Sequence, residues 1–216
     1  KKDITYPGLI NKRIRKGTWN IKEGPAMTRE EAIKSIEVGI EIVATLAKEG
    51  YNLLGTGEMG IGNTSTSSAV VMSLLDCNAD IAVGKGAGLT EEGLERKKGI
   101  INEAIRKNRI DRNDPLDILA KVGGFDIGGM VGCYLGAAYY RIPILIDGFI
   151  SAVAALLSYK LNPLVIDYIF PSHCSTEPGF DLVMEELNLN PFLNLSMRLG
   201  EGTGAAIGFK IIEAAR

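Results

Sequence analysis

The chain has 216 residues, enough for one sizeable hydrophobic core without a second full domain. Its 24 Lys and Arg residues against 26 Asp and Glu residues give a formal net charge of −2. This balance provides no electrostatic attraction to nucleic acid or to an anionic membrane surface, and it favours small-molecule partners.

Few side chains are available for metal binding or nucleophilic catalysis. The cysteines Cys77, Cys133 and Cys174 are odd in number and lack metal-ligand spacing, which indicates reduced thiols in a cytoplasmic protein. His173 is the one histidine, so a zinc site or a serine-type triad has little to build from. We expect no metal and no cofactor. We also expect no membrane span, because Asp147 interrupts the longest apolar run.

An extended arm and a long helix are predicted at the start of the chain. Residues 1–27 contain scattered glycines and prolines with little periodicity, so we expect an arm ahead of a single domain over 28–216. Thr28 and Glu31 form a capping box at the start of a helix, and Gly50 provides its stop. Helical spacing is kept by Ile36, Ile40, Val43 and Ala47.

Two short apolar runs, each followed by glycines, are interpreted as buried strands. The run NLLG (52–55) leads into a helix that begins at Asn63 and ends near Leu75. The stretch IAVGKGAG (81–88) has the same arrangement, and Thr90 with two following glutamates is typical of a capped, acidic first turn. The predicted pattern is strand, glycine loop and helix.

The middle of the chain predicts two successive helices. Asp114 and Pro115 open a short helix that ends at Gly123. The stretch 125–140 has glycines spaced four residues apart, which gives a smooth helix face suited to close packing rather than to a ligand. These glycines are Gly128, Gly132 and Gly136.

The strongest strand predictions are IPILID (142–147) and PLVIDYIF (163–170), separated by the helix-like stretch 148–160. Continuous apolar strands joined by helices are typical of a parallel sheet covered on both faces. We therefore expect an α/β fold, with a doubly wound, mostly parallel sheet in a Rossmann-like three-layer arrangement. In such sheets, ligands bind at the carboxyl ends of the strands.

Five glycine-containing segments place polar groups at that edge of the predicted sheet. None carries a P-loop lysine or a complete dinucleotide fingerprint, and each alone is a weak signal. Together they suit a nucleotide-sized ligand, which needs phosphate-binding amides near a carboxylate for ribose. The segments are GTGEMGIGNTS (55–65), VGKGAG with the following ERKK (83–98), IDGF (146–149), SHCSTEPG (172–179) and GEGTGA (200–205).

The individual residues also allow plainer interpretations. Glu58 could cap the turn that follows it, and Lys97 and Lys98 on a helix would ordinarily belong to a solvated face. His173, with no paired acid at readable spacing, is more typical of a loop hydrogen-bonding group, so we leave it out of the catalytic set. Asp147 ends a strand, where such sheets place functional groups.

Several motifs together resemble one enzyme family. The motifs are GEMGIGNT, the VGxGxGL loop with its downstream KK pair, KVGGFDI, DGFISA, SxEPG and RLGEGTGAA. From about Gly17 to the last residue, the chain resembles the nicotinate-nucleotide:5,6-dimethylbenzimidazole phosphoribosyltransferases. The resemblance implies transfer of phosphoribose from nicotinate mononucleotide to 5,6-dimethylbenzimidazole, giving α-ribazole 5′-phosphate and nicotinate. It also implies a homodimer and no metal.

The same resemblance implies roles for particular residues. Glu201 is the catalytic base, and Glu58 and Asp147 are further active-site carboxylates, Asp147 on the ribose side. Lys97 binds substrate, and Ser175 contacts the phosphate. The substrate-binding set is completed by Gly60, Gly62, Asn63, Thr64, Gly148, Gly202, Thr203 and Gly204.

The resemblance further implies parts that this sequence does not contain. Family members are longer at the N-terminus, where a small helical second domain supplies much of the pocket for the dimethylbenzimidazole ring. Two hypotheses stay open: an active phosphoribosyltransferase, or a chain without turnover that is a nucleotide-binding module or a partner subunit. For the enzyme, the acceptor could also be another benzimidazole, a purine or a phenolic compound.

Overall fold

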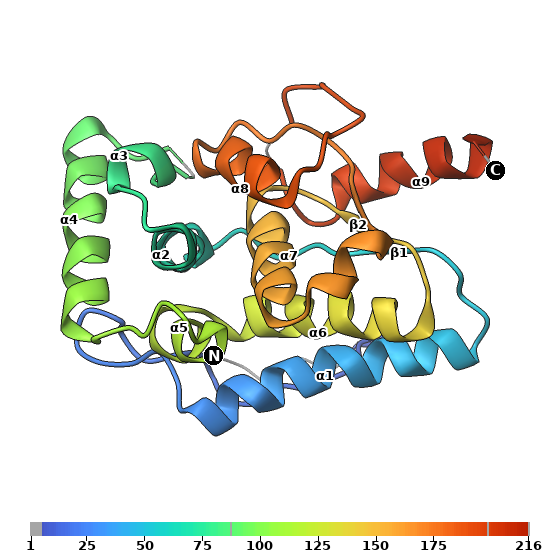
Figure 1. The fold of residues 1–216 in the computed structure, drawn as a ribbon, viewed down its shortest axis with the longest axis horizontal. Helices are drawn as coiled ribbons and strands as arrows, with labels where there is room; N and C mark the ends of the chain where they lie inside the picture. Colours follow the sequence, from blue (N-terminus) through green and yellow to red (C-terminus); the bar gives the residue numbers. More distant parts are fainter. Residues whose placement is uncertain (1–5, 87, 198, 216) are drawn as a thin grey trace.

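The computed structural model describes residues 6–86, 88–197 and 199–215 (Figure 1). Residues 1–5 of the predicted arm, Ala87 and Arg198 lie outside the described residues. No helix within the described ranges combines the length and apolar character needed to cross a membrane. The elements are α1 (Arg29–Lys48), β1 (Leu54–Gly55), α2 (Asn63–Leu75), α3 (Ala79–Ala82), α4 (Glu91–Lys107), α5 (Pro115–Val122), α6 (Phe125–Tyr140), β2 (Ile144–Ile146), α7 (Phe149–Leu161), the 3₁₀ helix η1 (Pro163–Tyr168), β3 (Ile169–Pro171), α8 (Gly179–Leu187) and α9 (Thr203–Ala215).

Local capping signals set most of the helix boundaries, and these predictions are confirmed. At the start of α1, the Thr28 side chain accepts from the Glu31 backbone N–H, and the Glu31 carboxylate accepts from the Thr28 backbone N–H. Thr90 caps α4 and Asp114 caps α5 through their side-chain oxygens. Gly50 after α1 has a φ of +87°, the left-handed conformation expected just past a helix end.

Two of the strand predictions are wrong at least in part. Residues 79–82 form the helix α3, whose first turn is capped by the Asn78 side chain. In 163–170, the first six residues form η1, because Asn162 caps the Leu164 N–H and Pro163 starts a helical turn. An apolar run alone does not distinguish strand from buried helix, and here the polar caps decide.

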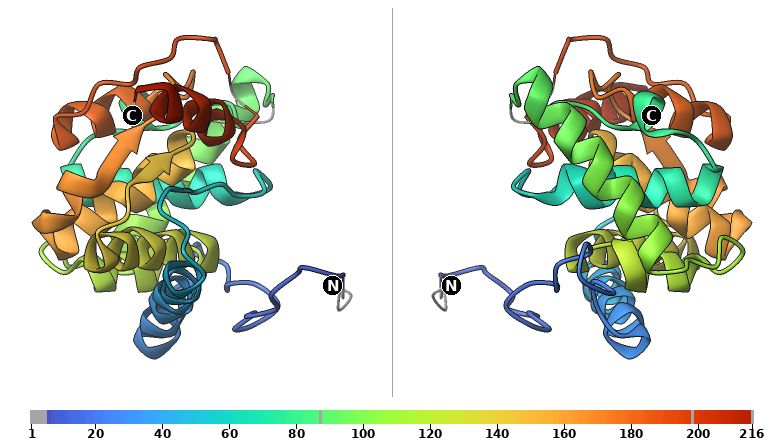
Figure 2. Two further views of the ribbon diagram at one scale, coloured as in Figure 1. Left: turned by 90° about the vertical axis from the view of Figure 1, so that its right-hand side faces the viewer. Right: turned by 90° about the vertical axis from the view of Figure 1, so that its left-hand side faces the viewer.

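The strands form a parallel sheet in the order β1-β2-β3 across the described residues. Ile144 of β2 pairs with Leu54 on one side and Ile169 on the other. All three residues of β2 are buried. Helix α7 packs on one face of β2 and α9 on the other, as Figure 2 shows. The predicted α/β class, with helices on both faces of a parallel sheet, is confirmed.

The described part of the predicted arm docks at its C-terminal end. Residues 6–27 contain turns and bends but no helix or strand. The N–H groups of Ala26 and Met27 donate to carbonyl oxygens in α5 at 3.0 and 2.9 Å, and both side chains are buried. Farther back along the segment, the Ile21 carbonyl accepts from Asn108 Nδ2 at 2.8 Å, and Arg15 pairs with Glu31 of α1 at 2.9 Å. The start of the described segment extends away from the body of the protein in Figure 2.

The glycine face of α6 packs against α1, as the four-residue glycine spacing predicts. A Cβ atom on Gly132 would lie 1.9 Å from the backbone oxygen of Ile36. From the other side, a Cβ on Gly39 would lie 2.0 Å from the backbone oxygen of Gly129. The two helix backbones therefore approach more closely than any side chain at these positions permits.

This contact gives a stability prediction with a control on the same helix. Gly132→Ala is expected to lower the free energy of unfolding by about 3 kcal/mol, since the new methyl group overlaps a backbone atom of α1. Gly129→Ala is expected to raise it by about 0.5–1 kcal/mol, because a Cβ there meets nothing within 4 Å. Urea unfolding of both variants tests this, and equal midpoints would contradict it.

Candidate functional site

A cavity of about 260 Å³ opens beyond the carboxyl ends of β1 and β2. All five glycine-containing segments singled out in the sequence contribute to its wall, so segments far apart in the chain do meet at one edge of the sheet. The lining residues are Glu58, Gly60, Thr64, Gly86, Gly148, Phe149, Ile150, His173, Ser175, Glu177, Leu199 and Gly200.

Glu58 is one of two carboxylates on the cavity wall, the other being Glu177. Its Oε2 atom accepts a hydrogen bond from Asn63 Nδ2 at 2.5 Å. Burial raises the pKa of the Glu58 carboxyl, and the nearby charges of Asp126, Asp147 and Glu201 raise it further, against the opposing effect of the Asn63 hydrogen bond. No side chain caps α2, so the interpretation of Glu58 as a cap for the turn that follows it is wrong.

The start of α2 lies next to this carboxylate. Its N-cap residue is Gly62, with a φ of +79°, and its first turn contains no acidic side chain. An uncapped helix N-terminus presents backbone N–H groups and a positive dipole end, the arrangement that binds phosphate. Of the predicted residues here, Gly60 and Thr64 line the cavity, while Gly62 and Asn63 lie behind its wall.

Lys97 is buried behind the cavity wall rather than solvated. Its Nζ donates to the carbonyl oxygen of Gly84 at 2.9 Å and to Thr64 Oγ1 at 3.1 Å, and the residue is 9% exposed. Burial lowers the pKa of its ammonium group. Lys98 instead forms ion pairs with Asp80 and Glu95, whose side chains are exposed. The solvated-face interpretation is therefore wrong for Lys97, and Lys98 is itself only partly exposed, with 16% of its side chain accessible.

Asp147 is a buried clamp for the last glycine loop. It follows β2 and is 1% exposed. Its carboxylate accepts the backbone N–H of Gly202 at 2.9 Å and that of Gly204 at 2.7 Å, so both oxygens are engaged. The residue is absent from the cavity wall. In the structure, Asp147 fixes the loop that leads into α9.

A buried hydroxyl network supports this clamp from below. The backbone N–H of Asp147 donates to Ser151 Oγ at 3.1 Å. Ser151 Oγ and Tyr134 Oη are 2.8 Å apart, and Tyr134 Oη is 2.7 Å from Thr56 Oγ1. Burial raises the pKa of the Tyr134 hydroxyl, which keeps it a hydrogen-bond donor. The network ties the ends of β1 and β2 to α6 and α7.

Glu201 lies in a loop with three consecutive positive φ angles. Gly200, Glu201 and Gly202 have φ values of +77°, +58° and +74°. The Glu201 side chain is exposed and is not part of the cavity wall. Its backbone N–H donates to the carbonyl oxygen of Glu58 at 3.1 Å, which places the residue beside the cavity mouth.

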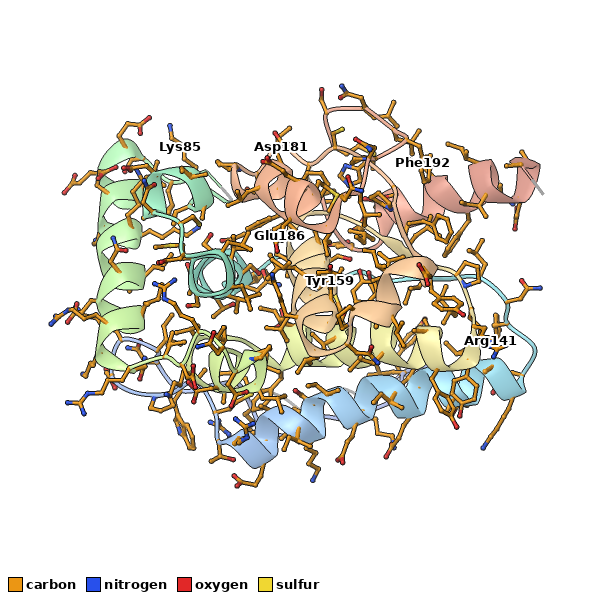
Figure 3. The ribbon with its side chains drawn as sticks, viewed as in Figure 1. Lys85, Arg141, Tyr159, Asp181, Glu186 and Phe192 are labelled. Carbon is orange, nitrogen blue, oxygen red and sulfur yellow. The ribbon has the colours of Figure 1, made fainter. Side chains whose placement is uncertain are left out.

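Close packing fixes the ends of this loop. A Cβ on Gly57 would lie 2.3 Å from the backbone nitrogen of Gly202, and the Thr203 hydroxyl donates to the Gly200 carbonyl at 2.7 Å. Farther along α9, Gly208 packs near Phe192, whose position is labelled in Figure 3. Gly57 and Gly208 thus have no room for a side chain. Between Gly200 and Gly202, by contrast, Glu201 carries a carboxylate.

His173 and Glu177 are cavity residues that the sequence reasoning left out. His173 is 2% exposed, and its Nδ1 lies 3.0 Å from the Cys174 carbonyl oxygen, as the loop hydrogen-bonding interpretation requires. Its Nε2 is buried without a hydrogen-bond partner, 3.8 Å from Asp147 Oδ1. Ser175, which was predicted, lines the same wall. The sequence signal that identifies His173 as a site residue is its position, because it closely follows β3, as Asp147 follows β2.

Gly148, Thr203 and Gly204 are the remaining residues that were predicted to bind substrate. Gly148 lines the cavity as predicted, whereas Thr203 and Gly204 are the first residues of α9 and are not part of the cavity wall. Across the described ranges, no group of three His, Cys, Asp or Glu side chains is arranged to hold a metal ion.

Comparisons with known proteins agree on one family. A family model described as "Phosphoribosyltransferase" matches residues 1–216. The nicotinate-nucleotide–dimethylbenzimidazole phosphoribosyltransferase of Acetivibrio thermocellus is 60% identical over 213 residues, covering 99% of this chain and 61% of that protein. The protein of the same name from Ruminiclostridium cellulolyticum is 61% identical over 213 residues, covering 99% of this chain and 60% of that protein.

A solved structure gives the same result. The crystal structure of CobT from Thermus thermophilus superimposes with a TM-score of 0.95 at 38% identity, covering 100% of this chain and 64% of that one. The chain thus spans about 60% of the length of the curated relatives it matches. The chain belongs to the phosphoribosyltransferase family that includes these nicotinate-nucleotide–dimethylbenzimidazole phosphoribosyltransferases.

Proposed function

We propose that this chain carries the site that transfers phosphoribose from nicotinate mononucleotide to 5,6-dimethylbenzimidazole, giving α-ribazole 5′-phosphate and nicotinate. The observation that supports this most is the meeting of five loops around one cavity, with the Glu58 carboxylate and Ser175 on its wall. The names of the relatives at about 60% identity support the choice of donor and acceptor.

The chemistry needs a proton acceptor and no acid. A benzimidazole nitrogen forms a bond to C1′ of the ribose while the C1′–N bond to nicotinate breaks, and that electron pair neutralises the pyridinium nitrogen. The acceptor base then loses the proton from its other ring nitrogen to a carboxylate. Attack from the face opposite nicotinate inverts the sugar from the β to the α configuration. Positive charge that develops at C1′ is stabilised by nearby carboxylates, of which Glu58 is on the cavity wall.

In this proposal Glu201 is the base. Its backbone N–H donates to the Glu58 carbonyl oxygen, so this exposed residue lies near the cavity mouth, through which an acceptor would enter. A residue other than glycine in the left-handed region costs backbone energy, which a functional side chain explains better than folding does. Asp147 then acts indirectly, because it holds the two glycine N–H groups that follow Glu201.

The phosphate is proposed to lie between the start of α2, Ser175 and Lys97. The ammonium group of Lys97 has three donors, of which two are used by Gly84 and Thr64. The third remains for a phosphate oxygen reaching the wall between Thr64 and Gly86, both of which line the cavity. The helix dipole of α2 attracts the same negative charge.

Lys97 and Lys98 provide a matched pair for testing this phosphate position. Lys97→Met is expected to weaken binding of nicotinate mononucleotide about 10- to 100-fold, the loss of one hydrogen bond to a charged group. Lys98→Met is expected to change the affinity less than about twofold, because its partners lie on the surface. Isothermal titration calorimetry measures both. Equal losses in the two variants would remove Lys97 from the site.

The reaction itself is tested by mixing the protein with nicotinate mononucleotide and dimethylbenzimidazole and measuring nicotinate release. A nucleotide-binding module without turnover would bind the nucleotide and release no nicotinate with any acceptor. Substituting another benzimidazole, a purine or a phenolic compound separates the alternative acceptors, since each gives release only if the protein accepts it.

The cellular compartment and the oligomeric state of the protein are also proposed here. We propose a cytoplasmic homodimer with the Rossmann-like arrangement that the parallel order β1-β2-β3 supports. The free thiols of Cys77, Cys133 and Cys174 support a reducing compartment. The glycine face of α6 is covered by α1 and so is not available to a second copy of the chain. Exposed apolar side chains, such as Tyr139 at 79% and Leu164 at 70%, support the homodimer.

A further inference from the structure

One buried amide joins two carboxylates behind the cavity. Asn63, the first residue of α2, is 7% exposed. Its Nδ2 donates to Glu58 Oε2 at 2.5 Å and to Asp126 Oδ2 at 2.9 Å, and it also lies 3.2 Å from the carbonyl oxygen of Met59. Its own Oδ1 is buried without a hydrogen-bond partner. One amide nitrogen, with two hydrogens, therefore serves three acceptors.

Asp126 reaches Glu58 from outside the cavity. It lies in the first turn of α6, is exposed, and does not line the 260 Å³ cavity. It lines a separate hollow of about 340 Å³ on the other side of Asn63, next to Lys16 and Thr18. The side-chain amide of Asn63 is thus the physical link between an exposed carboxylate and the Glu58 carboxylate on the cavity wall.

We propose that Asp126 is a positioning residue for Glu58, with the side-chain amide of Asn63 holding the two carboxylates together. Asp126 anchors the amide that donates to Glu58, and its negative charge makes ionisation of Glu58 less favourable. Glu58 then keeps a proton to a higher pH than a solvated glutamate does, while Asn63 limits the effect. This inference concerns the same site as the proposed phosphoribose transfer. Only its kinetic consequence rests on that proposed function.

The charges around Glu58 agree with this assignment. Acidic groups face it from three elements: Asp126 from α6, Asp147 after β2 and Glu201 in the loop before α9. Each raises the pKa of Glu58 in addition to burial, and Asn63 is the group that lowers it. Removing Asp126 and removing Asn63 should therefore shift the Glu58 titration in opposite directions.

An NMR titration of the Glu58 carboxyl group tests the proposal directly. In the intact protein labelled with ¹³C at glutamate carboxyl groups, Glu58→Gln identifies the Glu58 resonance. Asp126→Asn keeps an acceptor oxygen and removes the charge, so it should lower the pKa of Glu58 by about half a unit, a roughly threefold change in proton affinity. Asn63→Ala removes the donor and should raise it. Asp181→Asn, an equally exposed first-turn residue on α8 labelled in Figure 3, should leave it unchanged.

A purely structural role for Asp126 predicts different results. Asp126→Asn would then lower the free energy of unfolding without changing the pKa of Glu58, or Asp126→Asn and Asn63→Ala would shift that pKa in the same direction. Either outcome overturns the proposal. If nicotinate is released, the acidic limb of the kcat/KM profile should move to lower pH in Asp126→Asn. If none is released, the proposed reaction fails while the carboxyl titration still decides the role of Asp126.

Discussion

Glu201→Gln is expected to lower kcat for nicotinate release about 10³-fold while nicotinate mononucleotide binds with nearly unchanged affinity. Glutamine keeps the size of the side chain but cannot accept the proton that the acceptor base loses, and general base catalysis typically contributes about 10²- to 10⁴-fold. Affinity is kept because the Glu201 side chain does not line the cavity. Single-turnover release and calorimetric binding measure the two effects separately.

Two controls make the Glu201 result interpretable. Glu213→Gln changes an exposed glutamate of α9 paired with Lys210, and it should leave kcat within about twofold. Glu201→Gly removes the carboxylate but suits the φ of +58°, so it should be inactive yet at least as stable as the native chain. Turnover at the native rate in Glu201→Gln would eliminate this residue as the base.

The helix boundaries could be predicted because their causes are local. The ends of α2 at Asn63 and Leu75 follow from the glycine loop before the helix and the loss of periodicity after it. The sheet could be predicted in class but not in detail, since β3 starts only at Ile169. The prediction of a longer strand gave the apolar run more weight than the Asn162–Pro163 start of a 3₁₀ turn.

The site could be predicted as a set of converging loops, but not residue by residue. Lys97 and Lys98 are adjacent and chemically alike, and only the packing of α4 against α2 decides which one is buried. Asp147 was recognisable at a strand end, whereas its partners Gly202 and Gly204 lie more than fifty residues away. Which groups a carboxylate binds is a property of tertiary structure, and the sequence supplies only its position on the sheet edge.

Asp147→Asn is expected to remove most activity by releasing the loop that carries Glu201. An asparagine side chain offers one carbonyl oxygen where the carboxylate offers two acceptors, so its NH₂ group would face the N–H of Gly202 or Gly204. A buried N–H left without an acceptor costs about 1–3 kcal/mol, and more where the lost partner was charged. We expect a loss of this size in the free energy of unfolding and a fall in kcat of at least about 100-fold.

Two further measurements distinguish a role of Asp147 in holding the loop from a role in binding ribose. If Asp147 acts through the loop, kcat should fall more than affinity for nicotinate mononucleotide, and the amide resonances of Gly202 and Gly204 should shift in the free protein. A ribose contact would instead weaken nucleotide binding and leave those resonances in place. Asp167→Asn, at an exposed position in η1, is the matched control and should change neither quantity. Because Asp147 is buried and each of its oxygens binds a backbone N–H, we expect the first pattern.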